Sequence, residues 1–155
     1  NESLCEFWGE VLNNVFIISQ KDDKDKIKTL KHHLMYEGIF SITQCVKYLK
    51  IHGTTYRDIC NNPIKKEVTP GFSYYVLKSI LMTNVIPFLN KACTFSNPLK
   101  GSGNTEYFDF FNSFLLSQKD SPVMTIGTRQ LERYLKKCDK ETLLYKTARM
   151  GLYES

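Results

Sequence analysis

Apolar residues recur every three or four positions along most of the chain, and this spacing restricts the possible folds more than any other feature. The alternation of apolar and polar residues that is typical of strands is nearly absent. The pattern therefore predicts an all-α protein with seven or eight helices, packed as antiparallel hairpins. These would form either a short α-solenoid segment or an irregular helical bundle. The expected helices cover residues 3–18, 25–36, 41–52, 55–60, 71–93, 105–117, 128–138 and 140–150.

Glycine and proline residues predict where the helices end. Gly38 lies where a helix C-terminus would need a residue with left-handed backbone. Pro87 lies inside the apolar stretch 71–93 and should kink or divide that helix, because proline has no N–H to donate. Residues 123–126 are expected to be extended. Residues 96–104, which include proline and glycine, are expected to form a flexible loop.

The composition decides which broad class of protein this is. Of the 155 residues, 42% are hydrophobic and 24% are charged, which excludes disordered, collagen-like and low-complexity chains. The length fits one α-helical domain over residues 1–155. The longest unbroken apolar run, Val15–Ile18, is far too short to span a membrane. The start at Asn1, and an amphipathic stretch that begins just before the end, predict that this domain is a fragment of a longer protein.

The cysteines indicate the cellular compartment. There are five of them, an odd number, and no two form a Cys-x-x-Cys pair. Secreted disulfide-rich domains have a different pattern. We therefore expect reduced thiols in an intracellular protein, cytoplasmic in preference to nuclear.

One stretch of the sequence resembles a known repeat. Residues 30–53 read as a helix, a turn at Glu37–Gly38, a second helix and a stop at Gly53. This stretch resembles an α-helical hairpin of the pentatricopeptide and tetratricopeptide repeat families, and residues 148–154 resemble the same turn of a later hairpin. The resemblance implies a divergent array of hairpins, and such arrays bind peptides or single-stranded RNA. Because residues 70–121 match no repeat, the irregular bundle stays an open alternative.

No motif predicts a catalytic residue, a cofactor or a metal site. The histidines at positions 32, 33 and 52 are irregularly spaced with respect to Cys45 and Cys60, whereas a structural zinc site needs ligands in tight pairs. The glycines at 101 and 103 lack the spacing and the lysine of a phosphate-binding loop. A catalytic triad could still be assembled by the fold, so an enzyme with a site that is not visible in the sequence is one alternative.

Basic residues gather near the C-terminal end of a chain whose net charge is +5. In a continuous helix, spacings of three and four would align most of them in one stripe. The stripe has two interpretations: it binds nucleic acid or an acidic partner, or it is the solvated face of an amphipathic helix. The residues concerned are Arg129, Arg133, Lys136, Lys137 and Lys140.

These observations favour a non-catalytic interaction module, a scaffold or adaptor segment. Its partner would be another protein or the rest of its own chain, and we expect no membrane association. A long apolar helix surrounded by amphipathic ones is also how many helical domains expose a groove for a partner helix. Binding of single-stranded RNA through the basic stripe is the alternative, and an enzyme is the third.

Overall fold

The computed structural model describes residues 2–61, 70–99 and 105–138, and within these ranges every regular element is helical. The predicted all-α class is therefore confirmed. Seven helical segments result when the three consecutive pieces α4, η1 and α5 are counted together, again within the described residues. The elements are α1 (Glu2–Ser19), α2 (Lys26–Ile51), α3 (Tyr56–Asn61), α4 (Pro70–Phe72), the π-helical turn η1 (Ser73–Leu77), α5 (Lys78–Thr83), α6 (Val85–Ala92), α7 (Thr105–Gln118) and α8 (Pro122–Lys137).

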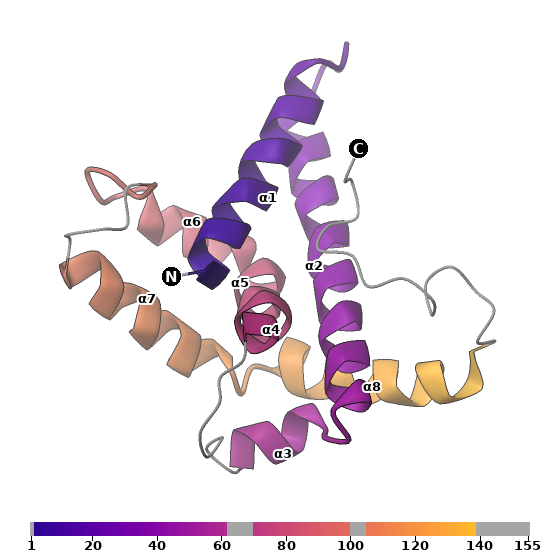
Figure 1. Ribbon diagram of the computed structural model, residues 1–155. Coiled ribbons are helices and arrows are strands. Elements are labelled where there is room, and N and C mark those ends of the chain that lie inside the picture. Colours follow the sequence, from indigo (N-terminus) through magenta and orange to yellow (C-terminus); the bar gives the residue numbers. More distant parts are fainter. Residues whose placement is uncertain (1, 62–69, 100–104, 139–155) are drawn as a thin grey trace.

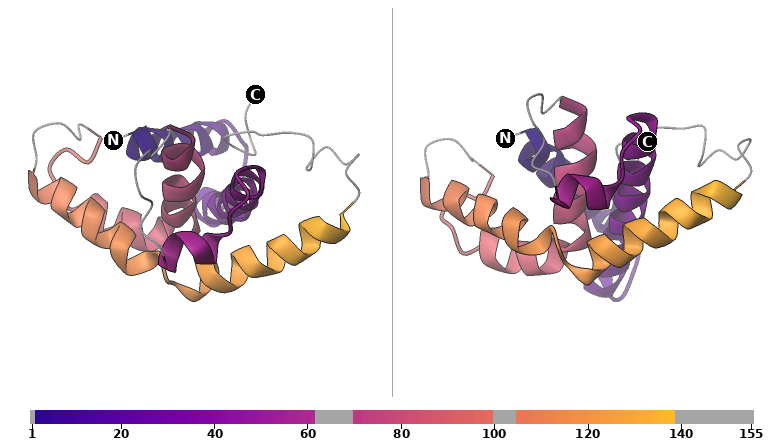
Figure 2. Two further views of the ribbon diagram at one scale, coloured as in Figure 1. Left: turned by 60° about the horizontal axis from the view of Figure 1, so that its bottom comes forward. Right: turned by 90° about the horizontal axis from the view of Figure 1, so that it is seen from below.

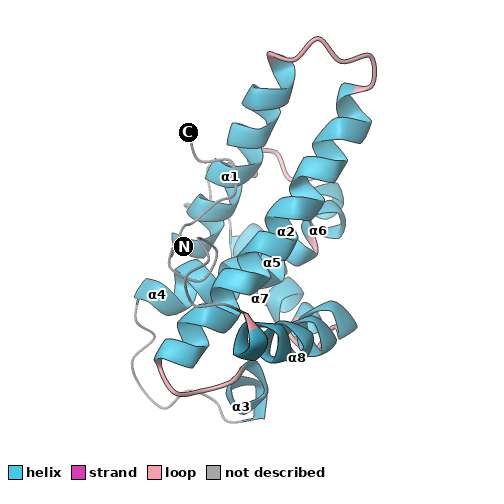
Figure 3. Ribbon diagram, turned by 90° about the vertical axis from the view of Figure 1, so that its right-hand side faces the viewer, coloured by secondary structure: helices cyan, strands magenta, loops and turns pink. Residues whose placement is uncertain are grey.

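The helices form an irregular bundle around α5. Helices α1 and α2 are antiparallel neighbours joined at one end of the molecule (Figures 1 and 3). Helix α5 contacts both of them and also contacts α6, α7 and α8. Figure 2 shows α7 and α8 following one another along one side of the molecule. The central position of α5 explains why its sequence is apolar on several sides.

Helix α2 is a single continuous helix of 26 residues, so the predicted turn at Glu37–Gly38 is wrong. The helix begins after Asp25, whose side chain accepts a hydrogen bond from the backbone N–H of Lys28 at 3.0 Å. It ends before Gly53, which has a φ of +66° and stops the helix as predicted. The hairpin that gave residues 30–53 their resemblance to a helical repeat is therefore not formed. The similar phrase at residues 148–154 lies outside the described residues.

Gly38 is a glycine because a neighbouring helix crosses closely over it. A Cβ atom at this position would lie 2.9 Å from the carbonyl oxygen of Met82 in α5. Real Cβ atoms do not approach a backbone oxygen that closely, so only glycine lets the two backbones meet here. The glycine that looked like a local stop signal is thus a packing residue.

We expect Gly38→Ala to destabilise the protein although alanine is the better helix former. Alanine gains about 1 kcal/mol in helix propensity, but the clash with a backbone atom costs about 1–3 kcal/mol. The control is Gly9→Ala in α1, where no atom lies within 4 Å of the new Cβ. That variant should be more stable than the wild type by about 0.5–1 kcal/mol. Urea unfolding measures both, and two changes of the same sign would contradict the crossing.

The apolar stretch after residue 70 divides near Pro87, as predicted. Proline cannot donate to the carbonyl four residues earlier, so the helix breaks at Asn84. The Asn84 side-chain amide donates to the carbonyl of Ile80 at 2.9 Å and closes the end of α5. The next helix then begins with a hydrogen bond from the backbone N–H of Phe88 to the Asn84 carbonyl at 3.0 Å.

The start of α8 differs from the prediction. Residues 123–126 are helical rather than extended, because the helix begins at Pro122 and not at Thr128. Proline is well suited to the first helical position, where its missing N–H has no intrahelical partner. Residues 96–99 lie outside any helix, in line with the predicted loop, whereas residues 100–104 and the helix expected over 140–150 lie outside the described residues.

Aromatic rings fill the core where α6 meets α1 and α7. Phe88 is fully buried, and its ring centroid lies 4.9 Å from that of Phe7 and 5.1 Å from that of Phe114. Phe110 stacks on it at 5.4 Å. The Trp8 indole also donates a hydrogen bond to the Tyr107 hydroxyl at 3.2 Å. These contacts fix α6 and α7 against the α1–α2 pair.

Candidate functional site: an apolar groove and a buried charge cluster

An open groove of about 620 Å³ lies between α2, α6 and α8, with α5 beneath it. The three helices that bound it can be followed in Figure 3. Most of the side chains along it are apolar, and among the described lining residues Lys31 is the charged one. We call this surface the groove. It is lined by Lys31, Met35, Gly38, Ile39 and Ile42 of α2, Met82 and Thr83 of α5, Val85, Ile86 and Pro87 of α6, and Val123, Gly127, Gln130, Leu131 and Tyr134 of α8.

Large apolar side chains on the walls of the groove are exposed to solvent. On α2, Met35 and Ile39 are 51% and 53% exposed, and on α8, Val123 and Tyr134 are 52% and 57% exposed. Single exposed apolar residues are common on protein surfaces, but a contiguous set around a concave surface is typical of an interaction site. Residues about ninety positions apart in the chain contribute to this set, so the tertiary structure assembles it.

The sequence contains a signal for one wall of the groove. Met35, Ile39 and Ile42 recur at helical spacing beside the buried Leu34. Together these residues make a wide apolar arc around α2. A helix with apolar residues over so wide an arc needs more than one neighbour. From the sequence we placed this arc only in a hairpin that does not form, so a groove was considered but its residues were missed.

The predicted basic residues lie on the solvent-facing side of α8. Arg129, Arg133, Lys136 and Lys137 are all exposed, and the helix is continuous through them. The buried side of α8 is formed by Met124, Thr128 and Leu135. The structure thus brings four of the five predicted site residues onto one helix, and Lys140 lies outside the described residues.

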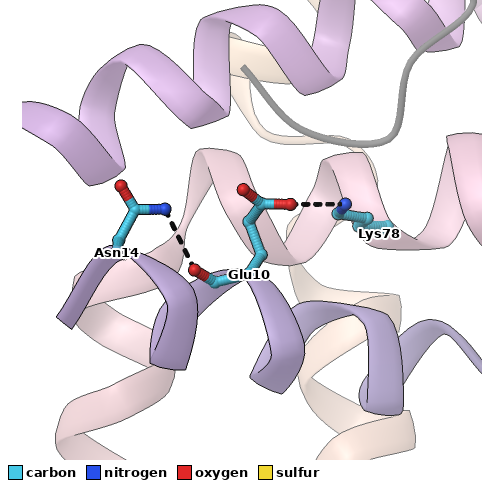
Figure 4. Close-up of polar contacts among 3 residues, drawn as sticks. All are labelled: Glu10, Asn14 and Lys78. Carbon is cyan, nitrogen blue, oxygen red and sulfur yellow. Dashed lines mark hydrogen bonds and ion pairs between the residues drawn. The ribbon is translucent and has the colours of Figure 1, made fainter. Parts of the chain in front are cut away.

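A second feature, a cluster of buried charges, joins three helices. The Lys78 ammonium of α5 lies 3.1 Å from Glu10 Oε2 of α1, and these side chains are only 1% and 8% exposed (Figure 4). Asn14 donates its side-chain amide to the backbone carbonyl of Glu10 at 2.9 Å. Glu37 of α2, also buried, is close enough to Glu10 to share a side-chain hydrogen bond.

Burial dominates the protonation of this cluster. It raises the pKa of the Glu10 carboxyl from 4.5 to about 7, against the opposing effect of the Lys78 ammonium. The charge of Glu37 and its hydrogen bond raise the pKa further. Glu10 and Lys78 were missed as a pair, although a lysine in the middle of the apolar stretch 71–93 was a signal that it needs a buried partner.

The charge cluster lies apart from the groove. Glu10, Glu37 and Lys78 do not line the groove. They also do not line the smaller cavity of about 130 Å³ between α3, α5 and α7. A perturbed carboxyl suggests catalysis when it faces a cleft that a substrate can enter. Here Glu10, Glu37 and Lys78 lie together where α1, α2 and α5 pack inside the bundle.

The histidines and cysteines do not converge in the part of the chain that the structure describes. Within it, no three or more His, Cys, Asp or Glu side chains are placed to hold a metal ion. Cys5, Cys45, Cys60 and Cys93 are free thiols. Cys45 is fully buried, and burial raises the pKa of its thiol to about 12. A thiol with such a pKa is a poor nucleophile at neutral pH.

Comparison of the chain with protein-family models, with curated proteins and with solved structures found no match. Among the described residues, no helix combines the length and the apolar character needed to cross a membrane. The function must therefore be argued from the geometry of the groove and from the charges around it.

Proposed function

We propose that this chain is a non-catalytic interaction module that binds a helical segment of another protein in the groove. The observation that carries the proposal is the groove itself, an open apolar surface between α2, α6 and α8. Covering a half-exposed side chain of the size of Met35 or Ile39 contributes about 1 kcal/mol. Several such side chains at one concave site can support specific binding. The free thiols of Cys5, Cys45, Cys60 and Cys93 fit a reducing, intracellular setting for this interaction.

A helix is the partner element that suits the groove best. The walls are themselves helices, so their side chains form the ridges between which another helix packs. Met35, Ile39 and Ile42 follow one another along α2 at spacings of four and three residues. A partner helix with apolar residues at positions i, i+3 or i+4, and i+7 has the matching repeat.

We expect Ile39→Glu to weaken binding of an amphipathic helix at least about tenfold, because it places a charge in the wall of the groove. The probe is a fluorescein-labelled, hydrocarbon-stapled helix with leucines on one face and glutamines on the other. Fluorescence polarisation gives its Kd. The control is Ile27→Glu, the same change on the same helix at a residue that is 65% exposed and outside the groove.

The binding position is checked by NMR of methyl-labelled methionines. Met35 and Met82 line the groove, whereas the buried Met124 does not. The probe should shift the first two methyl signals and leave the third unchanged. No saturable binding by the probe, or equal weakening by Ile39→Glu and Ile27→Glu, would contradict the proposal.

The exposed basic residues of α8 support a second candidate, binding of single-stranded RNA. Arg129, Arg133 and Lys136 point away from the buried side of a continuous helix, where they can follow a phosphate backbone. If this is their role, reversing the three charges abolishes RNA binding and its dependence on salt. Unchanged or absent RNA affinity in filter-binding measurements removes this candidate.

A further inference from the structure

We infer that the helix bound in the groove carries acidic side chains beside its apolar face. This inference rests on the proposed function and specifies the chemistry of the partner. It starts from the charges of the three helices that form the walls. Helix α2 has five lysines and one glutamate, α6 has one lysine and no acidic residue, and α8 has four basic residues and one glutamate.

Basic side chains continue both long walls of the groove. On α2, Lys31 lines the groove one turn before Met35, and Lys28 precedes it by one further turn on the same side. On α8, Lys137 follows Tyr134 by three residues and Gln130 by two turns, so it lies nearly in line with the groove-lining residues. A helix seated between these walls would have cations along its flanks.

The two glutamates of these helices do not offset the cations at the groove. Glu37 is buried and faces Glu10 in the charge cluster. Glu132 lies about 160° around α8 from Tyr134 and about 100° from Leu131, so it points away from the groove wall. Within α2, α6 and α8, the surface that a partner helix would meet is therefore apolar at the centre and basic at its edges.

This distribution disfavours two other occupants. A second copy of the chain carries a net charge of +5 and would bring the same basic edges to the contact. A nucleic acid would place its phosphates against Met35, Ile39 and Val123, which offer no hydrogen bond or charge. An acidic amphipathic helix satisfies both the apolar centre and the basic edges.

The test uses two stapled helices with the same leucine face, one flanked by glutamates and the other by lysines. We expect the glutamate helix to bind the wild-type chain about tenfold more tightly, since several exposed ion pairs of modest strength act together. The preference should shrink as salt screens these pairs. The double variant Lys31→Glu and Lys137→Glu should remove or reverse it.

The matched control is Arg129→Glu with Lys136→Glu, which changes the net charge by the same amount on the outer side of α8. This control should leave the preference for the glutamate helix nearly intact.

Three outcomes would contradict the inference. If the two helices bind equally well, and Ile39→Glu still abolishes that binding, the acidic partner is overturned and the groove function stands. If neither helix binds, both the acidic partner and the proposed groove function are overturned. If the preference is lost in the Arg129→Glu and Lys136→Glu variant but not in the Lys31→Glu and Lys137→Glu variant, the contact lies on the outer face of α8 and the inference is overturned.

Discussion

Replacing Lys78 with methionine should lower the free energy of unfolding by about 3–5 kcal/mol at pH 8. The substitution keeps the volume of the side chain but leaves Glu10 and Glu37 buried without the ammonium that lies 3.1 Å from Glu10. Chemical denaturation with urea measures the change. The control is Lys119→Met, which removes an exposed pair with Asp120 at 3.9 Å and should cost less than about 1 kcal/mol.

The loss in Lys78→Met should depend on pH in a defined direction. The Glu10 carboxyl has a pKa of about 7 in the folded protein and 4.5 as its ordinary value, so between these the folded state holds more protons. The contribution of Glu10 to stability is therefore fully present below pH 4.5 and is lost as the pH rises through 7. Because the Lys78 ammonium lowers this pKa, its removal raises the pKa further. The variant should accordingly be much less impaired at pH 5 than at pH 8.

A double variant separates the charge effect from the loss of packing. Lys78→Met with Glu10→Gln should recover part of the stability, because the amide carries no charge and can donate a hydrogen bond to Glu37. The two single effects should then be clearly non-additive. A loss in Lys78→Met that is small, or that is the same at pH 5 and pH 8, would contradict a buried ion pair at this position.

Replacing Phe88 with alanine should cost about 3–5 kcal/mol, the second large effect. The ring is 0% exposed and packs against Phe7 of α1 and Phe110 and Phe114 of α7, so its removal leaves a cavity that these two helices cannot easily fill. Thermal and urea unfolding measure the loss, and near-ultraviolet circular dichroism should show weaker aromatic signals.

The matched control for this change is Phe16→Ala in α1, at a ring that is 66% exposed. It should alter the free energy of unfolding by less than about 0.5 kcal/mol. Similar losses in the two alanine variants would contradict the assignment of Phe88 to the centre of the core. Phe88 also shares α6 with Ile86 and Pro87 of the groove, so its loss should weaken probe binding indirectly.

Sequence reasoning succeeded where short-range interactions decide the outcome. Pro87 removes a specific hydrogen bond within its own helix, and the break at Asn84 follows from that alone. It failed at Gly38, because a glycine has two uses that look alike in a sequence: ending a helix, and letting another backbone approach. The crossing helix that decides between them lies more than forty residues away.

The two surfaces described above differ in how far the sequence reveals them. The exposed basic residues of α8 were found because the spacing of charges on one helix needs no knowledge of its neighbours. The residues of the groove were not found, because Met35 and Ile39 become a binding surface only when Val123 and Tyr134 are brought beside them. The same holds for Glu10 and Lys78, whose meeting inside the bundle depends on how α1 and α5 pack.

By itself, the sequence determined that this chain is helical, where most of its helices begin and end, and that one face of α8 is basic. Those properties depend on residues within about one helical turn of each other. Only the tertiary structure decided that α2 runs unbroken across α5, that three charges are buried together, and that an apolar groove stays open at the surface. These depend on packing between residues far apart in the chain, where shape and burial outweigh local preference.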